Sequence, residues 1–183
     1  WDLKGKKYID MMCLVGQSII GYANNNLDRY VFSNAQKGIM TSLNCPEEVL
    51  LAEKILKLHP WAGMTKFARS GGEANALAIR IARAATGREH IAISGYHGWH
   101  DWYLSVNIKN KNNLSKFLFP GLNPYGVPKS LSNTCHAFQS NNLTSLKKII
   151  KKFRLAAICM EVARNKLPDK KMLYEIRKLA NKN

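Results

Sequence analysis

The sequence predicts an α/β fold in which helices connect strands of a parallel sheet. Three observations between Thr65 and Ser94 carry this prediction. Thr65–Ala68 has the short alternation of a strand, helical apolar spacing follows the turn at residues 70–73, and Ile91–Ser94 is a second short apolar run. A strand, a helix and a second strand in this order form the unit from which parallel sheets are built.

The turn Ser70-Gly71-Gly72-Glu73 is typical of a helix start. Ser70 can cap the first free N–H groups, and Glu73 can reach back to the cap, as in a capping box. Gly87 stands where a left-handed glycine would end the helix. Small apolar residues recur between these two points at helical spacing. The predicted core face of the helix consists of Ala74, Leu77, Ala78, Ile81, Ala82 and Ala85.

The glycine turn is predicted to lie at the carboxyl end of a parallel strand. A helix N-terminus there offers unpaired N–H groups to an anion, and Gly71 and Gly72 let the backbone approach it. The helix dipole contributes roughly 0.3–2 kcal/mol, which orients a phosphate without holding it. A plain glycine-rich helix cap is the alternative interpretation. The turn matches neither a Walker A loop nor a G-x-G-x-x-G turn.

A second turn, Gly95–Gly98, follows the Ile91–Ser94 strand and should emerge on the same edge of the sheet. Its aromatic residues suit a flat, phosphorylated cofactor, since ring stacking adds about 0.5–1.5 kcal/mol to area burial. The pair of motifs, Ser-Gly-x-Glu-Ala and then Gly-Tyr-His-Gly, resembles the class III aminotransferases. These are pyridoxal-phosphate enzymes of fold type I that include glutamate-1-semialdehyde aminomutase. The resemblance extends from Trp1 to Glu161.

The resemblance implies the large, mainly parallel-sheet domain of a fold type I enzyme, with three αβα layers. It implies pyridoxal 5′-phosphate as cofactor, bound by Ser70, Gly71, Gly72, Tyr96, His97 and Glu161. Tyr96 would stack on the pyridine ring, and His97 would shape the same wall. Glu161 ends the buried run Leu155–Met160, where the family commonly has Glu-Pro, although Val162 replaces that Pro. An ordinary strand-ending carboxylate is the alternative for Glu161.

The residues that carry the chemistry are expected outside this chain. Transamination with this cofactor needs a lysine that binds it as a Schiff base and a carboxylate against the pyridine nitrogen. In the family both follow the strand that ends at Glu161, so the Schiff-base lysine is expected beyond Asn183 and no catalytic residue within the chain. We therefore expect an internal piece of a longer protein, inactive by itself. The family also implies a homodimer, because its sites lie at a twofold interface.

The implied reaction moves an amino group between a small-molecule amino donor and a carbonyl substrate. Aminomutases of the family carry Ser-Trp where this chain has Leu14-Val15, which favours an aminotransferase over a glutamate-1-semialdehyde aminomutase. Many relatives have Thr where this chain has Gly72, which keeps the backbone donor but lacks the hydroxyl. A non-catalytic basic binding module is the alternative from another class.

The formal net charge of +16 is concentrated in the second part of the chain. Residues 109–183 contain 16 Lys and Arg against 3 Asp and Glu, whereas residues 1–108 contain 12 against 9. A basic segment can bind nucleic acid. Here, however, the lysines fall on the polar faces of expected helices and few aromatic residues lie between them. We therefore expect solvated helix faces and no nucleic-acid partner.

The composition indicates an ordinary globular protein, because 46% of the residues are hydrophobic. No apolar run is long enough for a bilayer and no signal-peptide pattern is present, so we expect no membrane partner and a cytoplasmic location. The four cysteines are scattered, which is typical of reduced thiols. His97, His100 and Asp101 cluster with the wrong spacing for a metal site, so no metal is expected.

The chain is expected to divide into an N-terminal hairpin and substrate-side segment, residues 1–25, and an incomplete cofactor-binding domain, residues 26–183. Two short strands are expected around Lys4-Gly5-Lys6. Residues 106–138, rich in Asn, Pro and Gly, are expected to form a long loop. Further helices are expected at residues 27–37, from Pro46 to His59, at residues 142–153 and after Asp169.

Overall fold

The computed structural model describes residues 1–39, 42–115, 122–163, 167 and 169–183. The chain forms two compact units, Trp1–Lys66 and Phe67–Asn183. The predicted division after residue 25 concerns function rather than compactness and stays a prediction. Unit 1 contains α1 (Cys13–Gly16), α2 (Asn25–Ala35) and α3 (Pro46–Leu58). Unit 2 contains, in chain order, α4 (Gly71–Thr86), β1 (His90–Ser94), α5 (Asp101–Leu104), η1 (Ser105–Asn107), η2 (Lys129–Leu131), β2 (Cys135–Ala137), α6 (Leu143–Lys152), β3 (Leu155–Met160) and α7 (Lys170–Lys182).

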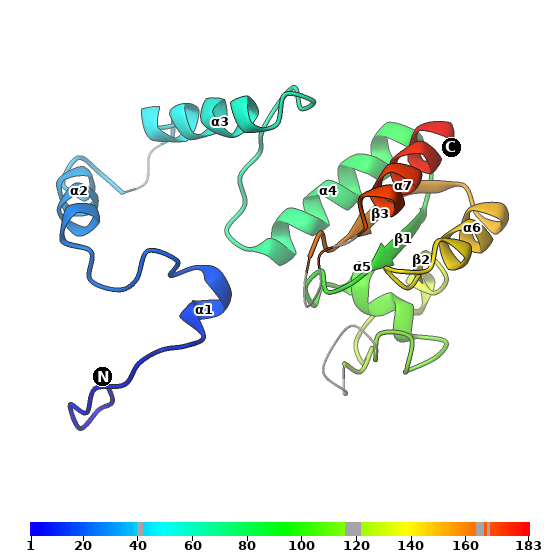
Figure 1. The fold of residues 1–183 in the computed structure, drawn as a ribbon, viewed down its shortest axis with the longest axis horizontal. Coiled ribbons are helices and arrows are strands. Elements are labelled where there is room, and N and C mark those ends of the chain that lie inside the picture. Colours follow the sequence, from blue (N-terminus) through cyan, green and yellow to red (C-terminus); the bar gives the residue numbers. More distant parts are fainter. Residues whose placement is uncertain (40–41, 116–121, 164–166, 168) are drawn as a thin grey trace. The chain divides into compact units, whose positions relative to one another are not determined.

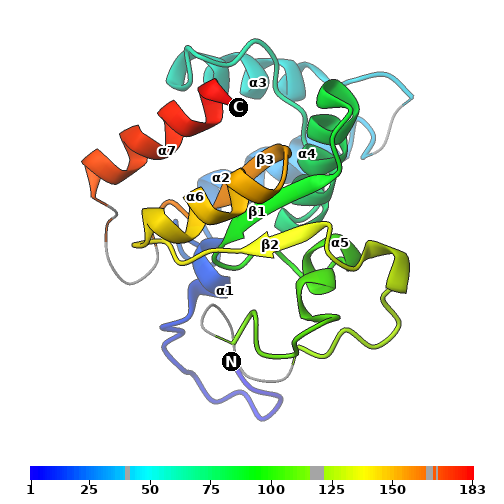
Figure 2. The same ribbon diagram turned by 90° about the vertical axis from the view of Figure 1, so that its right-hand side faces the viewer.

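Unit 2 is built on a parallel sheet in the order β2-β1-β3 (Figure 1). Side chains of β1 point alternately to its two faces. Ile91 and Ile93 pack with α4 and α5 on one face, whereas Ala92 packs with α6 and α7 on the other. Figures 1 and 2 show α4 and α6 on opposite sides of the strands. Helices therefore cover both faces of the sheet, which confirms the predicted α/β class and its αβα layers.

Helix α4 begins and ends where the sequence predicts. The Ser70 hydroxyl accepts a hydrogen bond from the Glu73 amide at 3.2 Å. The Glu73 carboxylate accepts one from the Arg69 amide at 2.9 Å, one residue before the amide that a standard capping box would use. Gly87, with φ of 64°, ends the helix in the left-handed conformation. Local side-chain chemistry therefore sets both ends.

The predicted core face of α4 is wrong. Its buried side chain is Ile79, with Ala76 packed beside the same core. Four members of the predicted face are exposed, namely Ala74, Ala78, Ile81 and Ala85. Small apolar residues occupy more than one side of this helix, so spacing alone could not show which side meets the sheet.

Two predictions about strands are also wrong. Thr65–Ala68 is not a strand, and it forms no ladder with β1, whose two edges are taken by β2 and β3. Within the expected loop at residues 106–138, Cys135–Ala137 form β2, which is too short for a sequence pattern to mark. Residues 116–121 of that expected loop lie outside the described residues.

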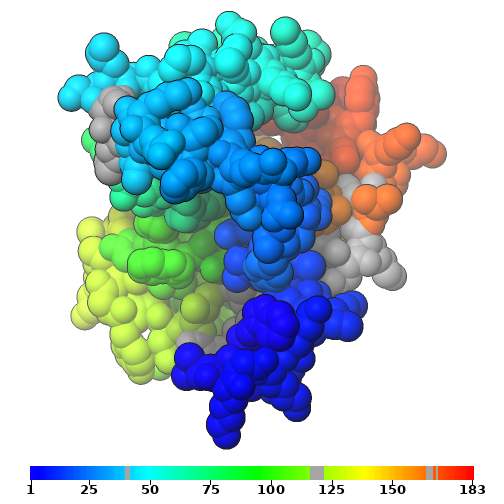
Figure 3. Space-filling model, turned by 90° about the vertical axis from the view of Figure 1, so that its left-hand side faces the viewer, coloured from blue at the N-terminus to red at the C-terminus, as the bar shows by residue number. Residues whose placement is uncertain are grey.

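Unit 1 is helical and open to solvent. The turn around Gly5 forms, with the Asp2 amide donating to the Lys6 carbonyl at 2.9 Å, but the predicted flanking strands do not. Two isolated segments without a third strand or a core rarely form a stable hairpin. None of the described residues of unit 1, blue to cyan in Figure 3, is buried. Helix α2 matches the expected helix at residues 27–37, and α3 that from Pro46.

The lysines of helix α6 lie on its exposed side. Leu146 of α6 is fully buried. The four lysines of the same helix are exposed, namely Lys147, Lys148, Lys151 and Lys152. In the described part of the chain, none of the helices combines the length and the apolar character that crossing a bilayer requires.

A histidine pair at the edge of the sheet should make stability depend on pH. The His136 ring stacks on Phe153 with centroids 4.0 Å apart, and its Nε2 lies 3.2 Å from Nδ1 of His90. Burial, followed by the charges of His90, Lys152 and Lys109, lowers the pKa of His136 from 6.5 to about 4. The unfolded chain therefore takes up this proton at a higher pH than the folded chain.

We expect the free energy of unfolding to fall as the pH is lowered from 6.5 towards 4. The contribution of His136 is complete above the unfolded pKa and is lost as the pH falls through the folded one. Burial also lowers the pKa of His97, which acts in the same direction. Urea unfolding across this range should show the slope, and His136→Gln should reduce it. An equally steep slope in the His136→Gln protein would contradict the assignment of this pH dependence to His136.

Candidate functional site

The two glycine turns meet at the carboxyl end of β1. A Cβ atom added to Gly98 would lie 2.9 Å from the Cα of Gly72, closer than real Cβ atoms come to backbone. The Asn75 side-chain amide donates to the His97 carbonyl at 3.3 Å, which links α4 to the second turn. Gly98 itself has a φ of 96°, a conformation that favours glycine. The prediction that both turns share one edge of the sheet is therefore confirmed.

The N-terminus of α4 presents backbone donors at this junction. The Glu73 amide bonds to the Ser70 hydroxyl and the Ala74 amide to the Ser70 carbonyl, so the helical ladder begins after Gly71 and Gly72. Ser70 and Gly71 are exposed, and Gly72 is half-buried. A Cβ atom on Gly71 would meet no atom within 4 Å. The turn thus leaves space for an anion at Gly71, and the Gly71 and Gly72 amides bond to none of the described residues.

The space beside Gly72 is filled by the imidazole of His100. A Cβ atom on Gly72 would lie 2.9 Å from Cε1 and 3.0 Å from Nδ1 of that ring. The ring also stacks on Trp99, with centroids 5.2 Å apart. His100 Nδ1 is buried without a hydrogen-bond partner among the described residues. A side chain at position 72 would therefore have to displace the His100 ring, a role for His100 that its sequence position alone did not indicate.

Tyr96 is the exposed aromatic residue at the second turn. It is 40% exposed and meets Tyr103 edge to face, with centroids 6.0 Å apart. Tyr103 is fully buried, and its hydroxyl donates to the Gly95 carbonyl at 2.9 Å. Tyr103 therefore supports the turn that presents Tyr96. Sequence reasoning missed this support, for which the dense aromatic run at residues 96–103 was the available signal.

His97 is buried beneath the same turn and is 5% exposed. Its Nε2 lies 3.0 Å from the Ser94 carbonyl oxygen, and its Nδ1 lies 3.5 Å from Sγ of Cys159. Burial lowers the pKa of His97, an effect that the Ser94 carbonyl and the charge of Glu161 partly offset. These contacts favour a neutral ring that ties β1 to β3. The predicted contact of His97 with a cofactor stays a prediction.

Glu161 lies against the start of the second turn. Its amide donates to the Ser94 carbonyl at 3.0 Å, which continues the pairing of β3 with β1. A Cβ atom on Gly95 would lie 2.7 Å from both Cγ and Oε2 of Glu161. Gly95 has a φ of 99°, so both conformation and contact require glycine. The structure therefore gathers all six predicted site residues around the two turns.

These residues fit a ligand that combines an anionic group with a flat ring. The open space at Gly71 and the free amides of the turn suit the anionic group. The exposed ring of Tyr96 suits the flat part. A phosphorylated aromatic cofactor has both features, and the assignment of Gly71 and Gly72 to its phosphate and of Tyr96 to its ring stays a prediction.

Comparison with known proteins decides the family. A family model described as Aminotransferase class-III matches residues 1–182. The chain belongs to the class-III aminotransferase family. It is 33% identical to 3-aminobutyryl-CoA aminotransferase of Cloacimonas acidaminovorans, covering 98% of this chain and 42% of that protein. It is 34% identical to glutamate-1-semialdehyde 2,1-aminomutase of Sulfolobus acidocaldarius, covering 95% of this chain and 42% of that protein.

Solved structures of transaminases share the fold of this class-III chain. An omega-transaminase from Sphaerobacter thermophilus superimposes with a TM-score of 0.83 at 25% identity, covering 98% of this chain and 43% of that one. A transaminase with PLP bound has the same fold, with a TM-score of 0.81 at 21% identity. The class-III chain spans about 42% of the length of the curated relatives it matches.

Proposed function

We propose that these residues form the cofactor-binding part of a pyridoxal-phosphate-dependent aminotransferase. The whole protein would move an amino group between a small-molecule donor and a carbonyl substrate. The contact of the two glycine turns at the N-terminus of α4, beside the exposed Tyr96, is the observation that carries this proposal. Membership of the class-III aminotransferase family supports it. Pyridoxal phosphate, when bound, supplies an electron sink for chemistry at the amino-bearing carbon.

Each part of the site has a separate task in this proposal. The amides of Gly71 and Gly72 donate hydrogen bonds to the phosphate. The Ser70 cap keeps the first turn of α4 ordered beside it. Tyr96 stacks on the cofactor ring. Glu161 holds the second turn in place by packing against Gly95. Each contact contributes on the order of 1 kcal/mol, so these residues orient the cofactor more than they retain it.

Retention of the cofactor requires a covalent bond that these contacts do not provide. We propose that a lysine after Asn183 forms the Schiff base and that a carboxylate on the strand following β3 meets the pyridine nitrogen. We also propose that the whole protein is a homodimer and that it is located in the cytoplasm. In the intact protein, borohydride reduction followed by peptide mapping should label one lysine outside residues 1–183. A single stoichiometric adduct within them would overturn this placement.

An aminomutase is the second candidate, because relatives at 29–34% identity carry that name. The segment Leu14-Val15 lacks the Ser-Trp pair typical of aminomutases. Its backbone is also unusual, with φ of 47° at Leu14 and 56° at Val15. The absence of the Ser-Trp pair favours the aminotransferase. Isomerisation of glutamate-1-semialdehyde by the intact protein without an external amino donor would favour the aminomutase instead.

Gly71→Asp should separate cofactor binding from folding. A side chain at this position meets no atom within 4 Å, and a carboxylate in the first turn of a helix stabilises it by about 0.3–1 kcal/mol. The fold should therefore remain as stable as before. The same charge lies beside the proposed phosphate, so the affinity for pyridoxal phosphate should fall at least about tenfold, or 1.4 kcal/mol.

The control for this experiment is Gly71→Asn, which has the same shape without the charge. Thermal unfolding and equilibrium dialysis against pyridoxal phosphate measure the two effects, and pyridoxal, which lacks the phosphate, serves as the comparison ligand. Both variants should bind pyridoxal like the parent protein. Undiminished binding of pyridoxal phosphate by Gly71→Asp would show that the phosphate does not lie at the α4 N-terminus.

A further inference from the structure

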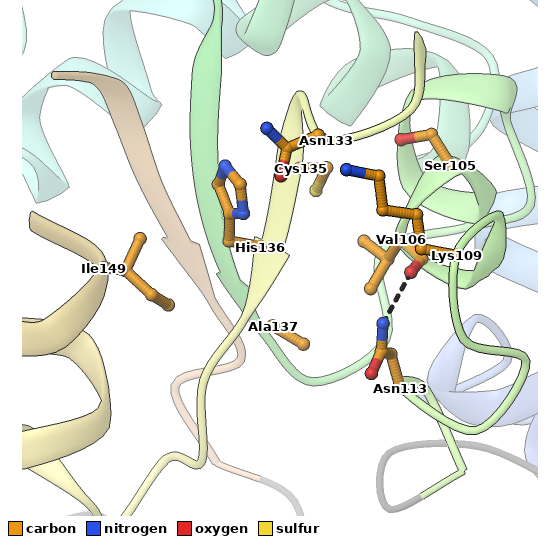
Figure 4. Close-up of a pocket in the computed structure, with 9 residues that line it drawn as sticks. All are labelled: Ser105, Val106, Lys109, Asn113, Asn133, Cys135, His136, Ala137 and Ile149. Atoms are coloured by element: carbon orange, nitrogen blue, oxygen red, sulfur yellow. Dashed lines mark hydrogen bonds between the residues drawn. The ribbon is translucent and has the colours of Figure 1, made fainter. Parts of the chain in front are cut away.

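A cavity lies along the outer edge of β2, with a volume of about 240 Å³. None of the residues that line it belongs to the candidate cofactor site. In Figure 4 the residues that line the cavity lie on both sides of β2. Lys109 and Val106 approach on the side of Cys135, and Ile149 lies on the side of His136. The cavity therefore follows β2, an edge strand that pairs only with β1 and is the shortest strand of the described sheet.

The backbone of β2 leaves hydrogen-bonding groups at this cavity. The Thr134 carbonyl accepts from the Ile91 amide at 2.9 Å, and the Phe138 amide donates to the Ile93 carbonyl at 2.8 Å. The N–H and C=O groups of successive residues in a strand point to opposite sides. The N–H and C=O groups of Cys135 therefore face away from β1, as do those of Ala137. Both residues line the cavity. Backbone N–H groups are thus available there to an acceptor.

The cavity also carries positive charge without a counter-charge among its lining residues. Lys109 is exposed and lines it, and none of the described residues that line it is a carboxylate. The charges of Lys109 and Lys152 act together on His136, where they add to the effect of burial in lowering its pKa. An acceptor that bears a negative charge would relieve this repulsion.

We propose that this cavity binds a small organic carboxylate. The carboxylate group accepts hydrogen bonds from the Lys109 ammonium and from an outward N–H group of β2, while the carbon chain packs on Val106, which lies on the same side of β2 as Lys109. Charge-assisted hydrogen bonds of this kind are the strong ones. The volume equals that of about eight water molecules at about 30 Å³ each, which suits a ligand of a few carbons. This site is separate from transamination and stands whether or not the proposed function holds.

Butyrate and butylamine test the proposal in the intact protein, because they share a carbon chain and differ in charge. NMR titration of the His136 ring should show its pKa rising with butyrate and unchanged with butylamine. Calorimetry should give a butyrate dissociation constant in the millimolar range, about −4 kcal/mol. Equal binding of both probes, or no response of His136 to butyrate, would overturn the site. Inorganic phosphate that binds as tightly as butyrate would overturn the assignment to carboxylates.

Two variants that change charge without removing packed side chains locate the ligand. Lys109→Gln removes the cation, and Asn133→Asp places a negative charge on the lining at an exposed residue, whose φ of 68° Asp also tolerates. Each should weaken butyrate binding about tenfold. Lys111→Gln is the matched control, because Lys111 lies over Tyr125 and outside the cavity lining. Unchanged affinity in both variants, or an equal loss in the control, would refute the proposal.

Discussion

Gly98→Ala should unfold at a lower temperature than Gly126→Ala and should lose affinity for pyridoxal phosphate. Both glycines have positive φ, 96° and 85°, so both variants carry a conformational cost of about 1–2 kcal/mol. Only at Gly98 does the added Cβ meet backbone, at 2.9 Å from the Cα of Gly72, whereas at Gly126 nothing lies within 4 Å. Backbone cannot rotate away as a side chain can, so overpacking adds about 1–3 kcal/mol.

Thermal unfolding measures this difference, because a loss of folding free energy lowers the melting temperature. Equilibrium dialysis measures cofactor binding in the same two variants. Gly126→Ala should bind like the parent protein, since it lies outside the contact of the turns. Equal melting temperatures for the two variants would mean that the turns can separate freely, and the site built on their contact would not stand.

Gly95→Ala should be strongly destabilising, and Glu161→Ala should restore part of the loss. The added Cβ would lie 2.7 Å from Cγ and Oε2 of Glu161, and the φ of 99° adds a conformational cost. The two effects together amount to about 2–5 kcal/mol. Truncating Glu161 removes the contact but leaves the conformational cost, so the double variant should recover about 1–3 kcal/mol relative to additivity.

Urea unfolding of the four proteins in this cycle gives the coupling between the two positions. A coupling near zero would show that the Glu161 side chain swings aside at no cost and does not fix the turn. The Glu161→Ala protein carries a second result. If it binds pyridoxal phosphate as tightly as the parent protein, Glu161 supports the turn without contacting the cofactor.

Features that depend on neighbouring residues in the chain could be predicted from the sequence. The ends of α4 follow from the Ser70 cap and from Gly87, and the buried strand β1 follows from the apolar run before Gly95. The buried face of α4 could not be predicted, because alanines lie on several sides and the sheet selects one. Strand β2 could not be predicted either, since three residues carry no pattern and its existence depends on pairing with β1.

The candidate site likewise has features that could be predicted from the sequence and features that could not. The two glycine turns and the placement of Tyr96 follow from local motifs. The reason for glycine at position 72 does not, because it is the ring of His100, which reaches this turn only once α4 has packed on the sheet. Tyr103 likewise supports the second turn through a hydrogen bond that spacing alone does not reveal.

The central position of β1 affects how the protein is synthesised. Both strands that flank β1 follow it in the chain, so β1 leaves the ribosome before either partner exists. Ile91, Ala92 and Ile93, all fully buried in the folded chain, stay exposed until β2 has been translated and, on the other edge, until β3 follows. Long loops must close before these contacts form, which slows folding. Nascent chains of this protein therefore present an apolar strand to chaperones, or to one another, for the time that translation takes to reach Met160.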